Sequence, residues 1–365
     1  MSGIFNCDNT VTIIGAKKRK FADNKCPNIF PMKRIYPLLI GVLSFGVLSC
    51  EKKETPYPIP DRPASSDSMK EAMVELGADY KTQVYFSFEN GVVKSLPYET
   101  WDINFTTDAS DNELRVNGGK LNLIYVTDAT RMSEISSSYT INSAKWKYDK
   151  PSGLSQTSGL GVLNNSAILG KVLIVQVGAD KSYKLIIKDV SPTAYTIATT
   201  KGLDDNTETE FVLEKDPNYN FIYFSFEDGI VTVEPPKKDW DIVFTRYRYI
   251  YEKYNPDGSD FLYGVTGVLH NPYNTMSAGD SLRTHDFYTF TKDSLDQHME
   301  LQTNRDVIGW NWKSVDINTA KYKVNSKMVY VVKDQKDILW KLHFYGYTND
   351  AGQNGYPKFR YEKLK

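Results

Sequence analysis

The feature that most constrains this chain is an internal duplication. Residues 84–93 are VYFSFENGVV and precede WDINFT at 101–106, while residues 222–231 are IYFSFEDGIV and precede WDIVFT at 240–245. The two blocks recur at offsets of 138 and 139 residues, so the spacing between them is kept as well. Such a repeat predicts one copy of a structural unit in each half of the chain.

Length and composition favour two β domains. The 365 residues suffice for two domains of roughly 150 residues, each with its own core. Aromatic residues lie in short alternating runs separated by Asn, Asp, Gly and Pro, a pattern typical of strands and turns. We therefore expect an all-β fold of two tandem antiparallel β-sheet domains, unit 1 at 69–215 and unit 2 at 216–365. With 44 basic and 45 acidic residues, the chain has no basic field for nucleic acid.

The segment 32–49 has the features of a lipoprotein signal peptide. Two basic residues precede an apolar run of about 14 residues, too short for the roughly 20 that span a bilayer. The run ends in VLSC, which is similar to a bacterial lipobox and predicts lipid attachment at Cys50. Residues 1–31 are then an upstream extension without a fold, and 50–68 form a flexible tether.

Local patterns predict the elements of the repeat. Ser68 with Glu71 resembles a capping box and predicts a short helix that ends at Gly77. The first repeated block predicts a hairpin around an Asn-Gly turn. Alternation in both WDI blocks places the tryptophan in the core, together with the two apolar residues that follow it at every second position.

A later hairpin shows that the copies differ in length. The strands expected at 172–177 and 183–187 have counterparts at 329–332 and 340–344, an offset of 157 rather than 139 residues. Unit 2 therefore contains about 18 more residues, which lie somewhere within 246–325. A lengthened loop on a shared scaffold is a natural place for a binding site.

Together these motifs resemble the HmuY family of haem-binding lipoproteins of Bacteroidetes. Unit 2 has YFSFEDG, WDIVF and the late hairpin VVKDQKDILWKLHF, whereas unit 1 has YFSFENG, WDINF, the turn RVNGG and the hairpin IVQVGADKSYKLII. The expected counterpart of RVNGG in unit 2 is NPDGSD at 255–260. The resemblance implies an outer-membrane lipoprotein, on the periplasmic or cell-surface side, that captures haem for iron acquisition. Its implied partners are haem or another small apolar ligand and a TonB-dependent outer-membrane receptor.

Enzyme chemistry is not indicated. The chain after Cys50 contains no further cysteine, no Gly-rich phosphate loop, no HExxH pair and no nucleophile elbow. All four histidines lie beyond residue 269, so unit 1 contains none.

The lengthened segment of unit 2 carries the candidates for haem binding. Haem iron takes one or two axial donors from His, Met or Tyr, and its propionates favour nearby cations. The preferred axial pair is His270 with His298, and the substitutes are His285, Met276 and Met299. The candidate propionate contacts are Arg246, Arg248 and Arg283. Each histidine could equally be an ordinary surface residue.

Other interpretations stay open. His343 is expected to be an exposed scaffold residue, on the strand face opposite Trp340. A surface glycan-binding lipoprotein would use aromatic stacking, with Trp146, Trp310 and Trp312 as candidates. A purely structural or adhesive lipoprotein would use neither kind of site.

Overall fold

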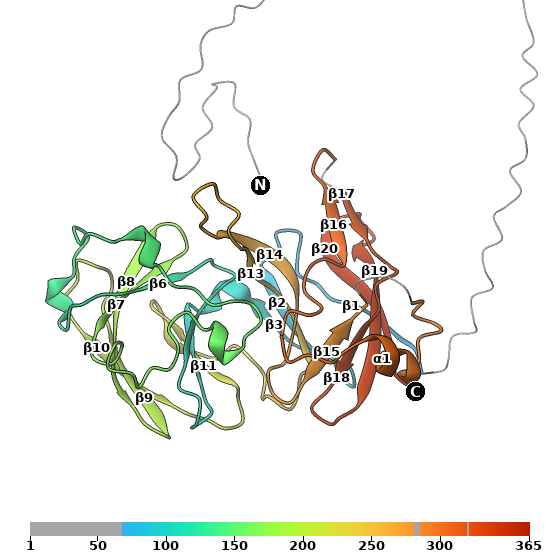
Figure 1. Ribbon diagram of the computed structural model, residues 1–365, viewed down its shortest axis with the longest axis horizontal. Helices are drawn as coiled ribbons and strands as arrows, with labels where there is room; N and C mark the ends of the chain where they lie inside the picture. Colours follow the sequence, from blue (N-terminus) through green and yellow to red (C-terminus); the bar gives the residue numbers. More distant parts are fainter. Residues whose placement is uncertain (1–67, 281–284, 320) are drawn as a thin grey trace, which may run out of the picture. The chain divides into compact units, whose positions relative to one another are not determined.

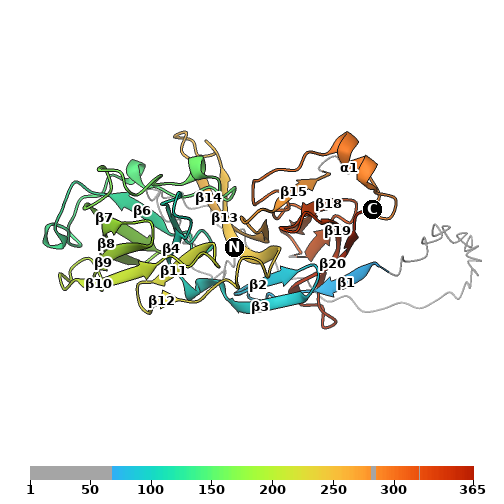
Figure 2. The same cartoon turned by 90° about the horizontal axis from the view of Figure 1, so that it is seen from below.

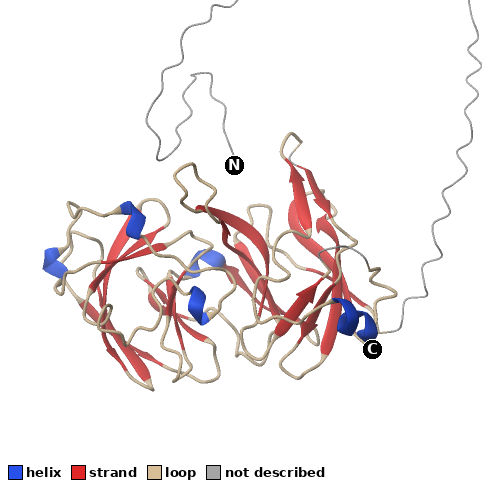
Figure 3. Ribbon diagram, viewed as in Figure 1, coloured by secondary structure: helices blue, strands red, loops and turns tan. Residues whose placement is uncertain are grey.

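The computed structural model describes residues 68–280, 285–319 and 321–365, which are almost entirely strands and connecting loops (Figures 1 and 3). The predicted segments 1–31 and 32–49, and 50–68 except for its last residue, lie outside the described residues, as do Cys50 and Arg283. The expected all-β antiparallel class is confirmed. Within the described ranges, no helix is both long and apolar enough to cross a membrane.

Twenty strands and a few short helices make up the fold. The first ten strands are β1 (Lys70–Met73), β2 (Thr82–Ser87), β3 (Gly91–Pro97), β4 (Ile103–Thr106), β5 (Leu114–Val116), β6 (Leu123–Val126), β7 (Val172–Val177), β8 (Lys181–Val190), β9 (Ala194–Thr199) and β10 (Thr209–Glu214). The others are β11 (Phe221–Ser225), β12 (Gly229–Val231), β13 (Ile242–Tyr251), β14 (Phe261–His270), β15 (Met276–Gly279), β16 (Lys313–Asp316), β17 (Lys321–Val324), β18 (Tyr330–Lys333), β19 (Leu339–Thr348) and β20 (Asn354–Lys363). The helices are α1 (Lys292–His298) and the 3-10 turns η1 (Tyr98–Thr100), η2 (Met132–Glu134), η3 (Ser143–Lys145) and η4 (Ser155–Thr157).

The two copies of the repeat exchange their first hairpins. One four-stranded sheet has the order β12-β11-β4-β5 and the other β14-β13-β2-β3. Each YFSF strand therefore pairs with the WDI strand of the other copy. Phe86 lies opposite Ile242, and Phe224 lies opposite Ile103 in the matching register. The exchange is thus reciprocal.

The aspartate of the WDI motif stabilises the pairing between strands of different copies. Asp241 Oδ2 accepts a hydrogen bond of 2.7 Å from the backbone N–H of Phe88, and Asp102 Oδ2 accepts one of 2.8 Å from Phe226. Both carboxylates are buried, and a buried acceptor without a partner would be costly. The short polar residue after the tryptophan therefore holds a strand of the opposite copy.

Two five-stranded sheets have the orders β10-β9-β8-β7-β6 and β1-β20-β19-β18-β15, and a two-stranded sheet of β16 and β17 completes the described fold. The helix expected after Ser68 is wrong, because β1 is an edge strand that runs antiparallel beside β20 (Figure 2). The inward residues Ala72, Val74 and Leu76 follow the period of two of a strand, and they pack on the core. Pairing with the distant β20 overrides the local helix signal.

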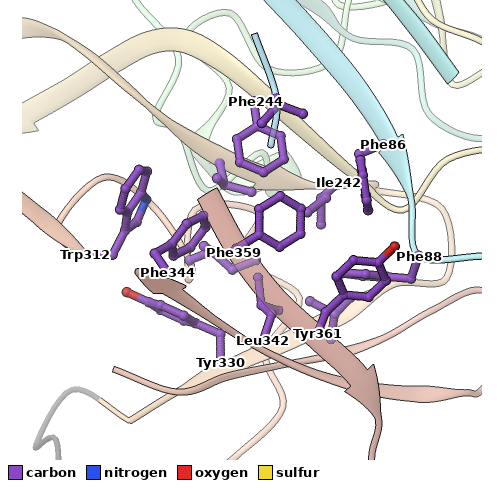
Figure 4. Packing of buried hydrophobic residues seen from close by; sticks show 14 of the residues in the cluster. Phe86, Phe88, Ile242, Phe244, Trp312, Tyr330, Leu342, Phe344, Phe359 and Tyr361 are labelled. Carbon is purple, nitrogen blue, oxygen red and sulfur yellow. The ribbon is translucent and has the colours of Figure 1, made fainter. Parts of the chain in front are cut away.

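The exchange of strands determines which residues form the two main hydrophobic cores. The larger core combines residues of β2, such as Phe86, with β13, β19 and β20, where Phe344 and Phe359 pack beside Phe244 (Figure 4). The other core lies entirely within residues 103–226. We call these the split core and the continuous core. The predicted division at 215/216 stays a description of the sequence repeat, and both sheet pairing and core packing cross it.

Most of the extra length in the second copy lies in the β13–β14 hairpin. The amide of Asn117 donates to the carbonyls of Tyr98 and Trp101, and the amide of Asn271 donates to those of Lys237 and Trp240. Asn271, and not the NPDGSD loop, is therefore the structural counterpart of Asn117. The Trp–Asn separation is 16 residues in the first copy and 31 in the second, so 15 inserted residues lengthen this hairpin.

Candidate functional site

A groove of about 510 Å³ contains two of the four histidines. We call it the histidine groove. Its floor is the outer face of β19 and β20, and its wall is the loop that leads into α1. The lining residues are His285, Asp286, Phe287, Tyr288, Ser326, Lys327, His343, Tyr345 and Arg360. Its volume falls in the range of about 300–1,000 Å³ that is usual for small-molecule sites.

His285 is held by a buried carboxylate. Its Nδ1 lies 3.1 Å from Asp280 Oδ2, and the same oxygen accepts the backbone N–H of His285 at 2.9 Å. A carboxylate on one ring nitrogen fixes the tautomer and orientation of the ring, as in most histidines that ligate metals. The ring of His298 lies 4.9 Å from that of His285, so these two candidates do come together.

His343 departs from its predicted exposure. Its side chain is 4 % exposed, because Phe287 stacks on the ring at a centroid distance of 4.4 Å. Nδ1 lies 3.2 Å from the carbonyl oxygen of Ser326, and Nε2 is buried without a hydrogen-bond partner among the described residues. Burial lowers the pKa of His343, so the ring is neutral, as a metal ligand must be. The expected orientation opposite Trp340 was right, but a loop covers that face.

His270 lies apart from the other candidates, in the interior. It is 0 % exposed at the end of β14, with Nδ1 2.7 Å from Ser277 Oγ. Burial, with the charge of Arg305 as a second cause, lowers its pKa to about 3. The structure does not bring His270 together with His298, which is exposed at the end of α1.

The two methionines are also separated. Met276 begins β15, while Met299 caps α1 and packs on the apolar cluster beneath that helix. Neither methionine lines the histidine groove. Within the described ranges, no three or more His, Cys, Asp or Glu side chains form a metal-binding group. Haem iron needs only one or two protein donors.

The two predicted arginines within the described residues lie elsewhere. Arg246 and Arg248 belong to β13 and line a second cavity, of about 120 Å³, that shares no residue with the histidine groove. We call it the arginine cavity. The cations at the histidine groove are Lys327 and Arg360, and the latter is paired with Glu71 at 2.6 Å.

A buried lysine closes the loop over the sheet in both copies. Lys341 Nζ donates to the carbonyls of Phe287 and Phe290 at 2.7 and 2.9 Å. Lys184, its counterpart 157 residues earlier, donates in the same way to Met132 and Ile135 at 2.9 and 3.0 Å. The K-L-H and K-L-I triplets of the two late hairpins therefore mark equivalent positions.

Sequence reasoning missed two site residues, His343 and Asp280. The signal for His343 was available, since its counterpart two residues after the buried lysine in the first copy is Ile186, a buried residue. Asp280 gave no local signal, because its role depends on the path of the loop after β15.

The fold and groove define an antiparallel β protein that gathers histidines in a surface groove. Residues 218–361 match the family model of the HmuY protein. The matched segment covers most of the second copy of the repeat, while β1 and β2, which contribute to its core, lie before it. A search of curated proteins finds no match.

Solved structures of related description align with most of the chain at low similarity. One is assigned as an HmuY-like haem-binding protein of Bacteroides vulgatus, with 10% identity over 81% of this chain and 91% of that one, at a TM-score of 0.21. Another is the apo HmuY analog of Tannerella forsythia, with 10% identity, 82% and 100% coverage and a TM-score of 0.22.

Proposed function

We propose that this protein is a lipid-anchored envelope protein that binds haem in the histidine groove for iron acquisition. The observation that carries the proposal is the pair His285 and His343, which line one groove and each have Nδ1 against an acceptor. That arrangement directs the Nε2 side of the ring to a metal. The match to the HmuY family model and the predicted lipobox at Cys50 support the same function.

The groove fits haem in chemistry as well as in size. Phe287, Tyr288 and Tyr345 offer aromatic surface to a porphyrin, and Lys327 lies at the groove to face a propionate. When bound, haem would take its axial donors from His285 and from His343. Because Phe287 covers His343, ligation by His343 requires the loop at 285–290 to move. A TonB-dependent receptor would then receive the haem.

A haemin titration followed by the Soret band tests this assignment. The intact chain is expected to give a shifted Soret band, which His285→Ala and His343→Ala each weaken about tenfold or more. His298→Ala is the matched control, because this exposed histidine touches the His285 ring but does not line the groove.

Two results would overturn the proposal. The first is a Soret band that the intact chain does not shift. The second is a shift that survives both groove substitutions and is lost in His298→Ala, which would favour the alternative pair of His298 with His270.

A specific observation also favours glycan binding as a second candidate. The tip of the β13–β14 hairpin presents neighbouring aromatic rings, with Tyr254 69 % exposed and its ring 5.7 Å from that of Phe261. The rings of Phe261 and Tyr263 are stacked at 6.0 Å. Of the tryptophans first considered, Trp312 is core, and Trp146 and Trp310 are partly buried. Polysaccharide binding that quenches fluorescence, and that Tyr254→Ala abolishes without changing the Soret response, would identify this second activity.

A further inference from the structure

The arginine cavity has walls from both copies of the repeat. Strands β4 and β5 of the first copy and β13 of the second line it, together with β2 and the turn after β5. Aromatic side chains close it, among them Tyr85, Trp101 and Tyr223. The exchange of hairpins therefore creates this cavity, which neither copy could form alone.

Positive charge dominates the lining. Five cationic side chains line the cavity: Arg115, Lys150, Arg246, Arg248 and Arg305. Only one lining residue, Asp149, is a carboxylate, and its two oxygens already accept the backbone N–H groups of Val116 and Gly159 at 2.7 and 2.8 Å. Arg115 and Lys150 are paired with Glu113 and Glu252. The other three arginines form no ion pair with any carboxylate that the structure describes.

Several donors in the cavity are buried and unpartnered. Arg248 is 2 % exposed, and its Nε and Nη1 have no hydrogen-bond partner among the described residues. The same holds for Arg115 Nη1, Arg246 Nε and Gln83 Nε2. Leaving buried charged donors without acceptors is strongly unfavourable, so a ligand rich in acceptor oxygens that reached them would be stabilised.

The turn opposite β13 keeps these arginines close to the cavity. Gly119 packs so closely on β13 that a Cβ there would lie 2.5 Å from the carbonyl oxygen of Arg246. Any side chain at this position would push away the strand that carries Arg246 and Arg248. The glycines of the RVNGG motif thus have a role in the cavity wall.

The size of the cavity selects a small ligand. Its volume of about 120 Å³ is well below the range of about 300–1,000 Å³ that is usual for larger small-molecule sites. A tetrahedral oxyanion fits this space, whereas a porphyrin does not. Guanidinium groups bind phosphate and carboxylate oxygens in pairs, which suits the fork-shaped donors present. One buried acceptor without a partner, Asn104 Oδ1, also lines the cavity and could accept the hydroxyl of hydrogen phosphate.

We propose that the arginine cavity binds inorganic phosphate. Arg246, Arg248 and Arg115 donate hydrogen bonds to the phosphate oxygens, and Asn104 Oδ1 accepts a hydrogen bond from the phosphate hydroxyl. Sulfate has no hydroxyl at neutral pH and therefore binds more weakly. This activity is independent of haem, because the two sites share no residue.

Isothermal titration of the purified chain with phosphate tests the proposal. At fixed ionic strength, phosphate is expected to bind and to raise the melting temperature, since it stabilises the folded state. Arg246→Gln removes the positive charge at a partly exposed position and leaves a shorter polar side chain, and it is expected to weaken phosphate binding about tenfold or more. Arg131→Gln is the matched control, because it removes an exposed arginine whose partner is Glu134.

The proposal is overturned if phosphate gives no heat and no thermal shift. It is also overturned if Arg246→Gln and Arg248→Gln, shown to be folded by circular dichroism, both bind phosphate like the unmodified chain. Sulfate that binds as tightly as phosphate would overturn the role of Asn104. Histidine variants that lose haem binding are expected to bind phosphate like the unmodified chain.

Discussion

The same buried lysine closes a loop over a sheet in both copies, but the enclosed chemistry differs. Beside Lys184 the covered residue is Ile186, within an apolar cluster that includes Met132 and Ile135. Beside Lys341 the covered residue is His343, and His285 lies at the mouth of the same groove. The comparison indicates that the scaffold is common to both copies and that the histidines are confined to the second. In the first copy, the same arrangement of loop and sheet encloses apolar side chains.

The largest expected effect concerns the exchanged hairpin. Removal of residues 68–97 takes Val84, Phe86 and Phe88 from the split core, at about 2–5 kcal/mol for each large side chain. The sum of about 6–15 kcal/mol is as large as a typical stability of about 5–15 kcal/mol, so residues 216–365 alone are expected not to fold. Residues 98–233 contain the whole continuous core and both of its sheets, and are expected to fold alone.

Circular dichroism with thermal melting distinguishes the two fragments. The missing piece, supplied as a separate peptide of residues 68–97, should restore a cooperative transition to residues 216–365. A cooperative melt of residues 216–365 without the peptide would show that the hairpins can return to their own copies.

The next largest expected effect is the loss of stability at low pH that is caused by the buried His270. His270 precedes Asn271 as Val116 precedes Asn117, so His270→Val gives the second copy the residue of the first. The folded-state pKa of His270 is about 3, below the unfolded value of about 6.5. As pH falls from 6.5 towards 3, the unfolded chain takes up a proton that the folded chain does not, so stability is lost.

Denaturant unfolding at two pH values measures how much His270 contributes to the pH dependence of stability. Between pH 7 and pH 4, His270 is expected to account for about 3 kcal/mol of lost stability, and His270→Val should reduce the total loss by that amount. His298→Ala, at an exposed histidine, should leave the difference unchanged. Equal losses in the unmodified chain and in His270→Val would contradict the interior position.

The smallest effect comes from exchanging the two residues under the loops. Ile186→His introduces an imidazole into an apolar cluster and is expected to destabilise the protein by about 2 kcal/mol without adding haem binding, since the first copy has no counterpart of His285. His343→Ile should preserve stability and weaken haem binding. Melting curves and haemin titration of the two variants check both statements, and strong haem binding by Ile186→His together with His285→Ala would refute them.

Local patterns predicted the strands well and their partners poorly. The hairpin from β2 to β3, the late hairpins and the buried Trp240 followed from alternation and turn residues, and these are present. Trp101, which was also expected in the core, is only partly buried. The pairing of β2 with β13 could not be predicted, because two nearly identical strands offer the same side chains to either partner. His285 was named only as a substitute axial ligand, and it lines the histidine groove. His270 was placed with His298 because distance along the chain carries no information on which face of a sheet a residue occupies.

The exchanged hairpin also sets an order of events during synthesis. Phe88 and its partner Asp241 are 153 residues apart, so β2 must wait for more than a hundred further residues before its neighbour exists. By then the continuous core has all of its strands. Strand β2, although made early, is therefore among the last strands to reach its final position. Until β13 has been made, the apolar side chains of β2 stay exposed, and a chaperone or secretion factor would protect them from aggregation during this period.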